Sequence, residues 1–244
     1  MPVALITGAS SGIGAAAARR FAAAGFDLLL LARRTGSLDA LAAELCSAHP
    51  SRIETAGIDL SEPSAIAAGI AELCGRGLVP SVLINNAGAA WTGSLAAMPL
   101  DRWQWLLQLN VTSVFQICQA VLPLMRAQER NGQLSGGGLI INVSSHAARN
   151  AFPDWGAYSA SKAALQTLSR CLATEEREHG IRVSTLTLGS VNTPLWDSEM
   201  VHSSFDRRAM LPVEQVAEAL LALAQQPSSQ VVEDLTLMPA VGAF

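Results

Sequence analysis

Short runs of apolar residues alternate with longer runs of helical periodicity along the whole chain. Strands are predicted where the runs are short and bounded by turn residues, at residues 3–7, 27–32, 52–58, 81–84, 138–143, 181–188 and 233–238. Amphipathic helices are predicted between them, at residues 13–24, 37–48, 63–74, 99–128, 155–179 and 212–225. Strands that alternate with helices are joined by right-handed crossovers. The pattern therefore predicts an α/β protein with a mostly parallel, seven-stranded sheet covered on both faces.

No segment of the sequence divides this pattern into two parts. The 244 residues are enough for one sizeable core, so residues 1–244 are expected to form a single domain. The glycine-rich residues 131–138 are interpreted as an enlarged helix-to-strand loop. In a doubly wound sheet, the ligand binds beyond the carboxyl ends of the strands, where the winding direction switches.

Composition and charge narrow the class of protein. Half of the residues are apolar and the formal net charge is −4, so a basic footprint for nucleic acid is absent from the sequence. The apolar residues 26–32 are too few to span a bilayer, and the first residues do not resemble a signal peptide. A cytoplasmic protein without a membrane partner is expected. The four cysteines and four histidines lack ligand spacing, so neither a metal site nor a disulfide framework is expected.

A glycine-rich turn follows the first predicted strand directly and leads into a helix. Gly8 permits a tight turn, Gly12 lets the backbone approach a pyrophosphate, and Gly14 lets the helix pack closely against the strand. The helix that begins at Ile13 points its free N–H groups at the phosphates. This strand–turn–helix context is the one that dinucleotide binding requires.

A tyrosine and a lysine lie four residues apart in the predicted helix 155–179. At this spacing Tyr158 and Lys162 share one helix face. A nearby ammonium group favours the phenolate and lowers the pKa of a tyrosine from ~10, so that the phenol can exchange a proton with an alcohol or carbonyl oxygen. Ser145 would hold the same oxygen, and His146 is expected to line the pocket or support the fold. Taken alone, such a Tyr–Lys pair is more often an exposed surface pair.

The motifs together resemble the short-chain dehydrogenase/reductase family. They are residues 145–162, 7–14 and 85–88, which follow the family's order and spacing over nearly the whole chain. The resemblance implies a Rossmann-type fold and hydride transfer between a nicotinamide cofactor and a carbonyl or alcohol carbon. The catalytic residues that it implies are Asn110, Ser145, Tyr158 and Lys162. The cofactor-binding positions that it implies are Gly8, Ser10, Ser11, Gly12, Ile13, Gly14, Arg33, Arg34, Asp59, Leu60, Asn85, Ala87, Gly88, Tyr158, Lys162, Gly189, Val191 and Thr193.

The resemblance also implies individual roles around the cofactor. Asp59 would meet the adenine amino group, because Ser61 is the better N-cap for the next helix. Asn85 would help to bind the cofactor, while Asn86 and Gly88 would mainly shape the sheet.

Other implied roles lie nearer the reacting atoms. Asn110 would kink its helix and hold a water that links Lys162 to solvent, and a buried capping role is compatible with this. The Val191 backbone would meet the nicotinamide carboxamide, and the Thr193 hydroxyl would hold the carboxamide or the pyrophosphate. Leu188 departs from the family's usual proline at this place, which should loosen the turn slightly.

The end of the second predicted strand bears on the choice between NAD and NADP. Ala32 stands where NAD-preferring members of the family usually carry an acid, and Arg33 and Arg34 follow. An arginine fork suits a phosphate dianion, so NADP(H) is predicted. The alternative is that both arginines are ordinary surface charges. Ser11 weakens the prediction, because many NADP-preferring relatives carry a basic residue near this position.

The predicted substrate lid covers residues 194–208 and contains several apolar side chains. Trp91, Phe152 and Trp155 fall on other loops expected at the same mouth. Loop aromatics are more often packing residues, but their convergence favours an apolar pocket and a hydrophobic or aromatic ketone as the small-molecule substrate. The apolar residues of two long predicted helices, at 103–109 and 163–172, favour a homodimer or homotetramer, although core packing explains part of this pattern.

These observations favour an NADPH-dependent carbonyl reductase, or equally an alcohol dehydrogenase working in reverse. A cofactor-binding regulatory or scaffold protein with little turnover is the alternative, and the complete set of proton-relay residues argues against it. An epimerase or dehydratase of the extended relatives would need a larger C-terminal substrate domain.

Overall fold

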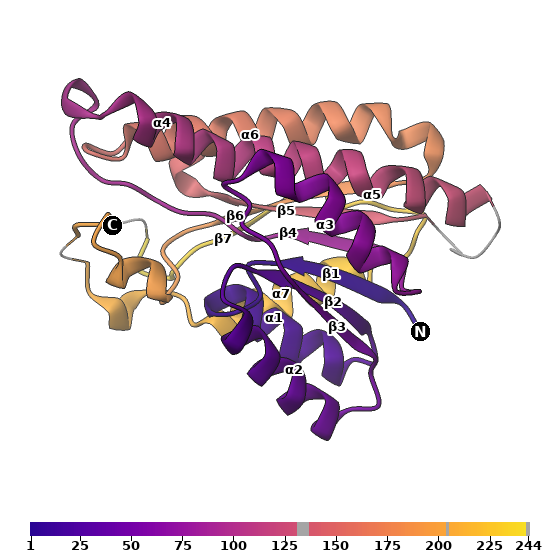
Figure 1. Cartoon of the computed structure of the whole chain (residues 1–244). Helices are drawn as coiled ribbons and strands as arrows, with labels where there is room; N and C mark the ends of the chain where they lie inside the picture. Colours follow the sequence, from indigo (N-terminus) through magenta and orange to yellow (C-terminus); the bar gives the residue numbers. More distant parts are fainter. Residues whose placement is uncertain (131–136, 204, 243–244) are drawn as a thin grey trace.

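The computed structural model describes residues 1–130, 137–203 and 205–242 (Figure 1). Within these ranges the strands are β1 (Val3–Thr7), β2 (Asp27–Ala32), β3 (Ile53–Gly57), β4 (Val82–Asn85), β5 (Leu139–Ser145), β6 (Arg182–Leu188) and β7 (Asp234–Leu237). They form one sheet in the order β3-β2-β1-β4-β5-β6-β7. Every pair of neighbours is parallel, so the expectation of an α/β fold with a mostly parallel sheet is confirmed, and the sheet is parallel throughout.

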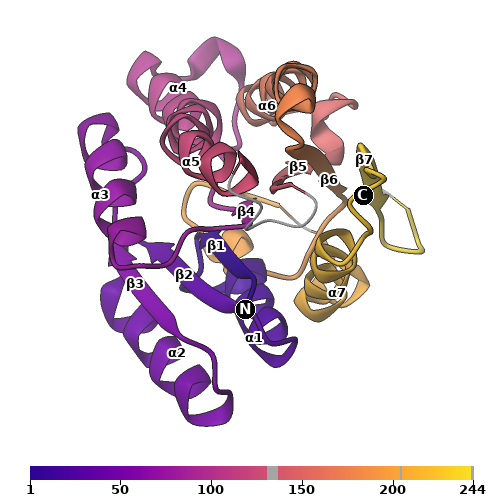
Figure 2. The same ribbon diagram turned by 90° about the vertical axis from the view of Figure 1, so that its right-hand side faces the viewer.

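Helices cover both faces of the sheet. They are α1 (Gly12–Ala23), α2 (Thr35–Ala48), α3 (Pro63–Gly75), α4 (Leu100–Leu107), α5 (Ser113–Arg130), α6 (Gly156–Glu175) and α7 (Val213–Ala224). Figure 2 shows α1, α2 and α7 on one face, and α3, α4, α5 and α6 on the other. Most element ends lie within about two residues of the predicted ones, as is usual for helix and strand boundaries, but the helix predicted to run to residue 179 ends at Glu175, and a separate 3-10 turn follows at Arg177–His179. Most of the loop predicted for residues 131–138 lies outside the described residues.

The prediction of one continuous helix at residues 99–128 is wrong. The segment 99–128 is divided into α4 and α5 by a π-helical turn, Gln108–Thr112. Among the described residues, the combined helical stretch Leu100–Gln128 is long and apolar enough to cross a membrane by length and composition alone. Half of its most apolar window is buried within the protein, and a core helix passes the same test. Its composition is therefore weak evidence for a membrane span.

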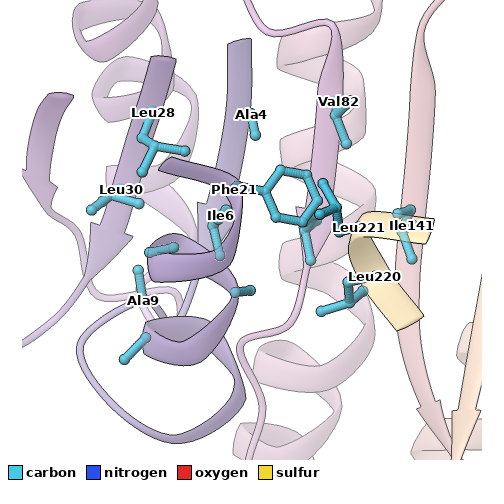
Figure 3. Close-up of a cluster of buried hydrophobic side chains, with 14 of the residues drawn as sticks. Ala4, Ile6, Ala9, Phe21, Leu28, Leu30, Val82, Ile141, Leu220 and Leu221 are labelled. Atoms are coloured by element: carbon cyan, nitrogen blue, oxygen red, sulfur yellow. The ribbon is translucent and has the colours of Figure 1, made fainter. Parts of the chain in front are cut away.

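The strand residues alternate between two hydrophobic cores, one on each face of the sheet. Ala4 and Ile6 of β1 face the core under α1, α2 and α7, whereas Leu5 faces the core under α3, α5 and α6. Figure 3 shows the first of these cores, in which Phe21 of α1 lies among strand residues and Leu220 of α7. Because both faces are buried in the middle of the sheet, strands β1, β2 and β4 are nearly uniformly apolar, which is typical of a parallel sheet, whereas the edge strands β3 and β7 are partly exposed and carry polar residues.

An ion pair joins the two long helices on one face. The Arg126 guanidinium of α5 donates from Nε to Glu176 Oε2 at 2.9 Å and from a terminal nitrogen to the other carboxylate oxygen. The Glu176 side chain, at the end of α6, is only 2% exposed. Two parallel bonds satisfy a carboxylate that would otherwise be buried without a partner.

The strand order places a switch point between β1 and β4. The chain winds outward from β1 to β3, then returns to pair β4 with the other side of β1 and winds outward again to β7. The loops that follow β1 and β4 therefore leave the sheet in opposite directions, which opens a crevice beyond the carboxyl ends of the strands.

Candidate active site

Two connected cavities occupy this crevice. The inner cavity is lined by Ser145, Tyr158 and Lys162, and the outer cleft by the glycine-rich turn, Arg33 and Arg34. The residues that line both are Ile13, Asn86, Gly88, Ala89, Thr193 and Leu195. Most of the predicted cofactor positions line one or both cavities. The predicted positions that line neither are Gly14, Asp59, Asn85 and Asn110.

The turn between β1 and α1 has a shape that only glycine allows. Gly12 has φ +54°, in the left-handed region, and a Cβ added to Gly14 would lie 2.3 Å from the carbonyl oxygen of Gly8. No Ser11 side-chain bond caps the first turn of α1, so its N–H groups face the outer cleft without competition from that hydroxyl. The exposed helix N-terminus and the absent side chains fit the pyrophosphate of a dinucleotide.

The loop after β4 is tied to β1. The hydroxyl of Thr7 accepts hydrogen bonds from the backbone N–H groups of Asn86 and Ala87, both at 3.0 Å, and the Asn86 amide donates to the Thr7 carbonyl at 2.9 Å. This agrees with the shaping role expected for Asn86, which also lines both cavities. The loop is thereby held against the glycine-rich turn.

The side chain of Asn85 lies in the core and faces neither cavity. It is 2% exposed and donates to the side chain of Asn142 on β5 at 2.8 Å, and Asn142 donates in turn to Ser169 on α6 at 2.8 Å. The structure therefore places the Asn85 side chain away from both cavities, and the cofactor-binding role expected for Asn85 stays a prediction. A buried amide must find polar partners, and here these partners cross from the sheet to α6.

Arg34 folds back over the glycine-rich turn. Its guanidinium donates to Ser11 Oγ at 2.8 Å and to Ser10 Oγ at 3.3 Å. Residue 11 is a serine and carries no charge, but the Arg34 guanidinium, which follows β2, brings a positive charge to this position. Arg33 extends beside it with 61% of its side chain exposed, 4.0 Å from a carboxylate oxygen of Asp59. Two guanidinium groups therefore line the same part of the outer cleft, next to the end of β2.

Asp59 is engaged within its own loop, contrary to expectation. Its Oδ1 accepts from the backbone N–H of Ser61 at 2.9 Å and from the Ser61 hydroxyl at 2.7 Å. Burial alone would raise the pKa of Asp59, but these bonds and the charge of Arg33 together lower it. Ser61 is not the N-cap of α3, which is Glu62 without a side-chain bond. Both donors of Ser61, the backbone N–H and the hydroxyl, bind Asp59, so the Ser61 side chain is not used to cap the helix.

Tyr158 and Lys162 lie on the buried face of α6, next to Ser145 at the end of β5. The Lys162 ammonium donates to the carbonyl oxygen of Val143 at 2.9 Å and lies 5.8 Å from the centre of the Tyr158 ring. Ser145 Oγ accepts from the backbone N–H of Ala147 at 3.2 Å. The three functional groups line one cavity, so the surface-pair alternative for Tyr158 and Lys162 is excluded.

Burial shifts both titratable groups of this set toward their neutral forms. It raises the pKa of Tyr158, and hydrogen bonding with Ser145 offsets only part of the increase. It lowers the pKa of Lys162 to about 8. The expected lowering of the tyrosine pKa by the lysine is therefore not found, because desolvation is the largest influence on the pKa of Tyr158. The phenol remains protonated at neutral pH.

Asn110 lies in the π-helical turn and joins three segments. Its side chain exchanges two bonds of 2.9 Å with the backbone of Ala89 and donates to Ser161 Oγ at 2.9 Å. A Cβ added to Gly88 would lie 3.1 Å from Asn110 Oδ1 and 3.6 Å from the Lys162 nitrogen, so Gly88 separates these two groups. The expected break in the helix is present, and the amide secures the loop after β4 against α6.

The loop after β6 carries the remaining predicted positions. Gly189 and Val191 line the inner cavity, and Thr193 lines both cavities. The Trp196 indole donates to the Val191 carbonyl at 2.8 Å. Its ring lies 5.7 Å from Trp155, between that ring and Phe205. Trp155 in turn meets the Tyr158 ring edge-on at 5.5 Å. An aromatic wall thus runs from the proton donor to the predicted lid.

Further residues line the inner cavity, and two of them, Ser144 and Ser190, had no signal in the sequence. His146 lines the inner cavity, which agrees with the expectation that it lines the pocket. The centre of its ring lies 6.2 Å from the centre of the Phe152 ring. Ser144 and Ser190 also line it, and their buried hydroxyls have no hydrogen-bond partner among the described residues. The outer end of the lid is held by Thr92, whose hydroxyl accepts from the backbone N–H of His202 at 2.7 Å.

A buried phenol in one cavity and a turn shaped for phosphates in the neighbouring cleft, at the switch point of a parallel sheet, are the features of an oxidoreductase that uses a dinucleotide and acts on a carbonyl or alcohol group. The chain matches the short chain dehydrogenase family from residue 2 to residue 202. It therefore belongs to that family.

Individual relatives agree with this assignment. The chain is 32% identical to sulfoacetaldehyde reductase 2 of Chromohalobacter salexigens, over 99% of this chain and 96% of that protein. The structure resembles that of a metagenomic short-chain oxidoreductase in complex with NADP, with a TM-score of 0.82 and 33% identity over 98% of this chain and 97% of that one. It also resembles a short-chain dehydrogenase from Sphingobium yanoikuyae in complex with NADPH, with a TM-score of 0.83 and 31% identity over 99% and 89% of the two chains.

Proposed function

We propose that this protein is an NADP(H)-dependent oxidoreductase that reduces an apolar or aromatic ketone or aldehyde to the alcohol. The observation that carries the proposal is the joint placement of Ser145, Tyr158 and Lys162 in the inner cavity, which shares lining residues with the outer cleft. The reverse oxidation uses the same groups. In this proposal residues 194–208 serve as the substrate lid.

The chemistry divides between the cofactor and the side chains. The nicotinamide, when bound, supplies or accepts the hydride. The Ser145 hydroxyl would hold the carbonyl oxygen of the substrate, and the Tyr158 phenol would donate a proton to that oxygen. Because burial raises the pKa of Tyr158, the phenol stays protonated at neutral pH, which suits reduction. Lys162 would favour the phenolate that reduction leaves behind and would bind the nicotinamide ribose.

The preference for NADP(H) rests on the adenosine end of the outer cleft. Ala32 at the end of β2 offers no carboxylate that would repel a 2′-phosphate, and Arg33 and Arg34 bring two guanidinium groups to the same place. Solved relatives in complex with NADP and NADPH support a nicotinamide cofactor, and the arginines are the reason to prefer its phosphorylated form. Replacement of Arg34 by leucine should weaken the affinity for NADPH by ~10-fold, which is the equivalent of one charge-assisted bond. The affinity for NADH should stay nearly unchanged. Equal affinity of the wild type for NADPH and NADH would contradict this part of the proposal.

The substrate class follows from the lining of the inner cavity. Among the described residues that line it, Lys162 is the only lysine or arginine, and aspartate and glutamate are absent. Phe152, Trp155, Trp196 and Phe205 line one side. An uncharged aromatic or branched aliphatic carbonyl compound fits such walls. Sulfoacetaldehyde, named for one relative, carries a sulfonate, which would need an arginine or lysine besides Lys162, and the described residues that line this cavity include none.

The oligomeric state belongs to the same proposal. Leu100 at the start of α4 and Phe115 on α5 are exposed by 69% and 47%. Exposed apolar residues on two neighbouring helices favour a second copy of the chain as the partner, in a homodimer or homotetramer.

Tyr158→Phe tests the central claim. The phenylalanine variant should lose ~100-fold or more of carbonyl reduction, the usual contribution of general acid catalysis, while its affinity for NADPH stays within about twofold. A panel of aromatic and aliphatic ketones, followed by the absorbance of NADPH, provides the assay. An active variant would remove Tyr158 from its role. A wild type that binds NADPH tightly and turns over none of the panel would favour a regulatory, cofactor-binding protein instead.

A further inference from the structure

Arg207 makes three bonds to one short segment of chain. Its Nε donates to Asn192 Oδ1 at 2.7 Å, one terminal nitrogen donates to Asp197 Oδ1 at 2.8 Å, and the other donates to the Thr193 carbonyl oxygen at 3.0 Å. All three acceptors lie in residues 192–197, which run from the loop after β6 into the predicted lid at residues 194–208. The planar fork of a guanidinium can reach three acceptors at once, whereas a lysine nitrogen is a single point.

The neighbouring arginine shows what an ordinary surface arginine does here. Arg208 bonds only to Asp206, two residues away, through its Nε and one terminal nitrogen at 3.2 Å, and its side chain is 91% exposed. The Arg207 side chain is 36% exposed, and its partners Asn192 and Asp197 lie 15 and 10 residues earlier in the sequence. Both residues are arginines in the same 3-10 turn, but of the two only Arg207 contacts the segment that reaches the cleft.

The segment held by Arg207 covers the phosphate end of the crevice. A Cβ added to Gly12 would lie 3.4 Å from the Thr193 methyl group, so Thr193 lies directly against the glycine-rich turn. Thr193 lines both cavities, and Trp196, three residues further on, lines the inner one. The position of both side chains therefore depends on where residues 192–197 are fixed.

We propose that Arg207 is a positioning residue, which clamps residues 192–197 over the glycine-rich turn and thereby sets the affinity for the dinucleotide. This inference rests on the proposed function, because it assigns the crevice to NADP(H). Arg207 acts through Thr193 and touches neither cavity itself. Loss of the clamp frees the segment before cofactor binds, so that binding must order it again. The effect falls on the binding of NADPH and not on the chemical step.

The experiment compares Arg207→Ala with Arg208→Ala in the full-length protein. Tryptophan fluorescence, to which Trp155 and Trp196 in the inner cavity contribute, reports the Kd for NADPH. Arg207→Ala should raise the Kd and the KM for NADPH by ~10-fold, as expected for ~1.4 kcal/mol of lost preorganisation, and should leave kcat at saturating NADPH within about twofold. Arg208→Ala should change neither. Arg207→Lys should recover only a small part of the affinity.

The result that would overturn the proposal is an unchanged Kd for Arg207→Ala, or a fall in kcat at unchanged KM for NADPH. If Arg207→Ala fails to fold, Asp197→Asn removes the charge of one exposed acceptor, and it should still raise the Kd by ~3-fold; no change would overturn the proposal equally. A wild type that binds NADPH but reduces no carbonyl compound would contradict the proposed function and leave the Kd comparison valid.

Discussion

Replacement of Lys162 by methionine should make the folded protein more stable at neutral pH, although it removes a residue of the proposed catalytic set. The side chain is 5% exposed, and burial lowers its pKa from 10.5 to about 8. Each pKa unit is equivalent to about 1.4 kcal/mol, so the difference of 2.5 (10.5 − 8) corresponds to ~3 kcal/mol of strain from the buried cation. Methionine fills a similar volume without charge, but it loses the bond to Val143, which offsets about 1 kcal/mol.

The pH dependence has a definite sign. Below pH 8 Lys162 is protonated in both the folded and the unfolded protein, so folding carries the full cost of the buried charge. Between about 8 and 10.5 the unfolded chain holds a proton that the folded protein has released, so the stability of the wild type rises with pH. Above this window both forms are neutral and the cost is gone. The advantage of Lys162→Met should therefore be largest below pH 8 and should fade as the pH rises through the window.

Urea unfolding of the two proteins, at neutral pH and in steps to about pH 10, measures this difference, and all other groups titrate alike in both. Lys162 is the only lysine in the sequence, so the ε-amino resonance of isotope-labelled lysine also reports its pKa directly. A stability difference that is independent of pH, together with a lysine pKa near its ordinary value, would refute the burial of this ammonium group.

Three further outcomes test other parts of the structure. Gly14→Ala should lose ~2 kcal/mol of stability in urea unfolding and most of its NADPH affinity, because the added Cβ meets a backbone oxygen at 2.3 Å; a fully stable variant would contradict the turn geometry. Tyr158 is the only tyrosine, so the alkaline rise of tyrosinate absorbance should have its midpoint above ~10, and a midpoint below that value would show that the lysine charge dominates. Arg126→Met should lose ~3 kcal/mol in thermal or urea unfolding by leaving Glu176 buried without a partner, and Arg126→Met with Glu176→Gln should recover part of it.

The elements of the fold could be predicted because each is encoded locally. A parallel strand buried on both faces is a short apolar run, and each such run was found within about two residues of its observed ends. The division of the predicted helix 99–128 could not be found in this way. It is associated with Asn110, whose amide bonds to Ala89, 21 residues earlier in the chain, and periodicity within a helix carries no information on such a partner.

The site shows the same limit at the level of single side chains. The sequence located the turn, the Tyr–Lys pair and the arginines, because the motifs fix which strand each one follows. It could not tell that the Asn85 side chain turns into the core while Asn86 faces the cleft, or that Ser61 binds Asp59 and does not cap α3. Arg34 reaches Ser11 only because β2 lies beside β1. Each difference arises from a partner that is distant in sequence or from competition between two nearby acceptors.

Burial acts on Tyr158 and Lys162 in opposite directions, and this bears on the direction of the reaction. An ordinary lysine loses its proton at about the same pH as an ordinary tyrosine, near pH 10. Here the lysine pKa falls to about 8 while the tyrosine pKa rises, so the ammonium group loses its proton well before the phenol does. At neutral pH the pair is therefore a phenol beside an ammonium ion, which is the state that gives a proton to a carbonyl oxygen. Oxidation of an alcohol needs the phenolate. A rise in pH removes the cation that would stabilise this phenolate before it forms, so the two pKa shifts favour the proposed reduction over the reverse oxidation.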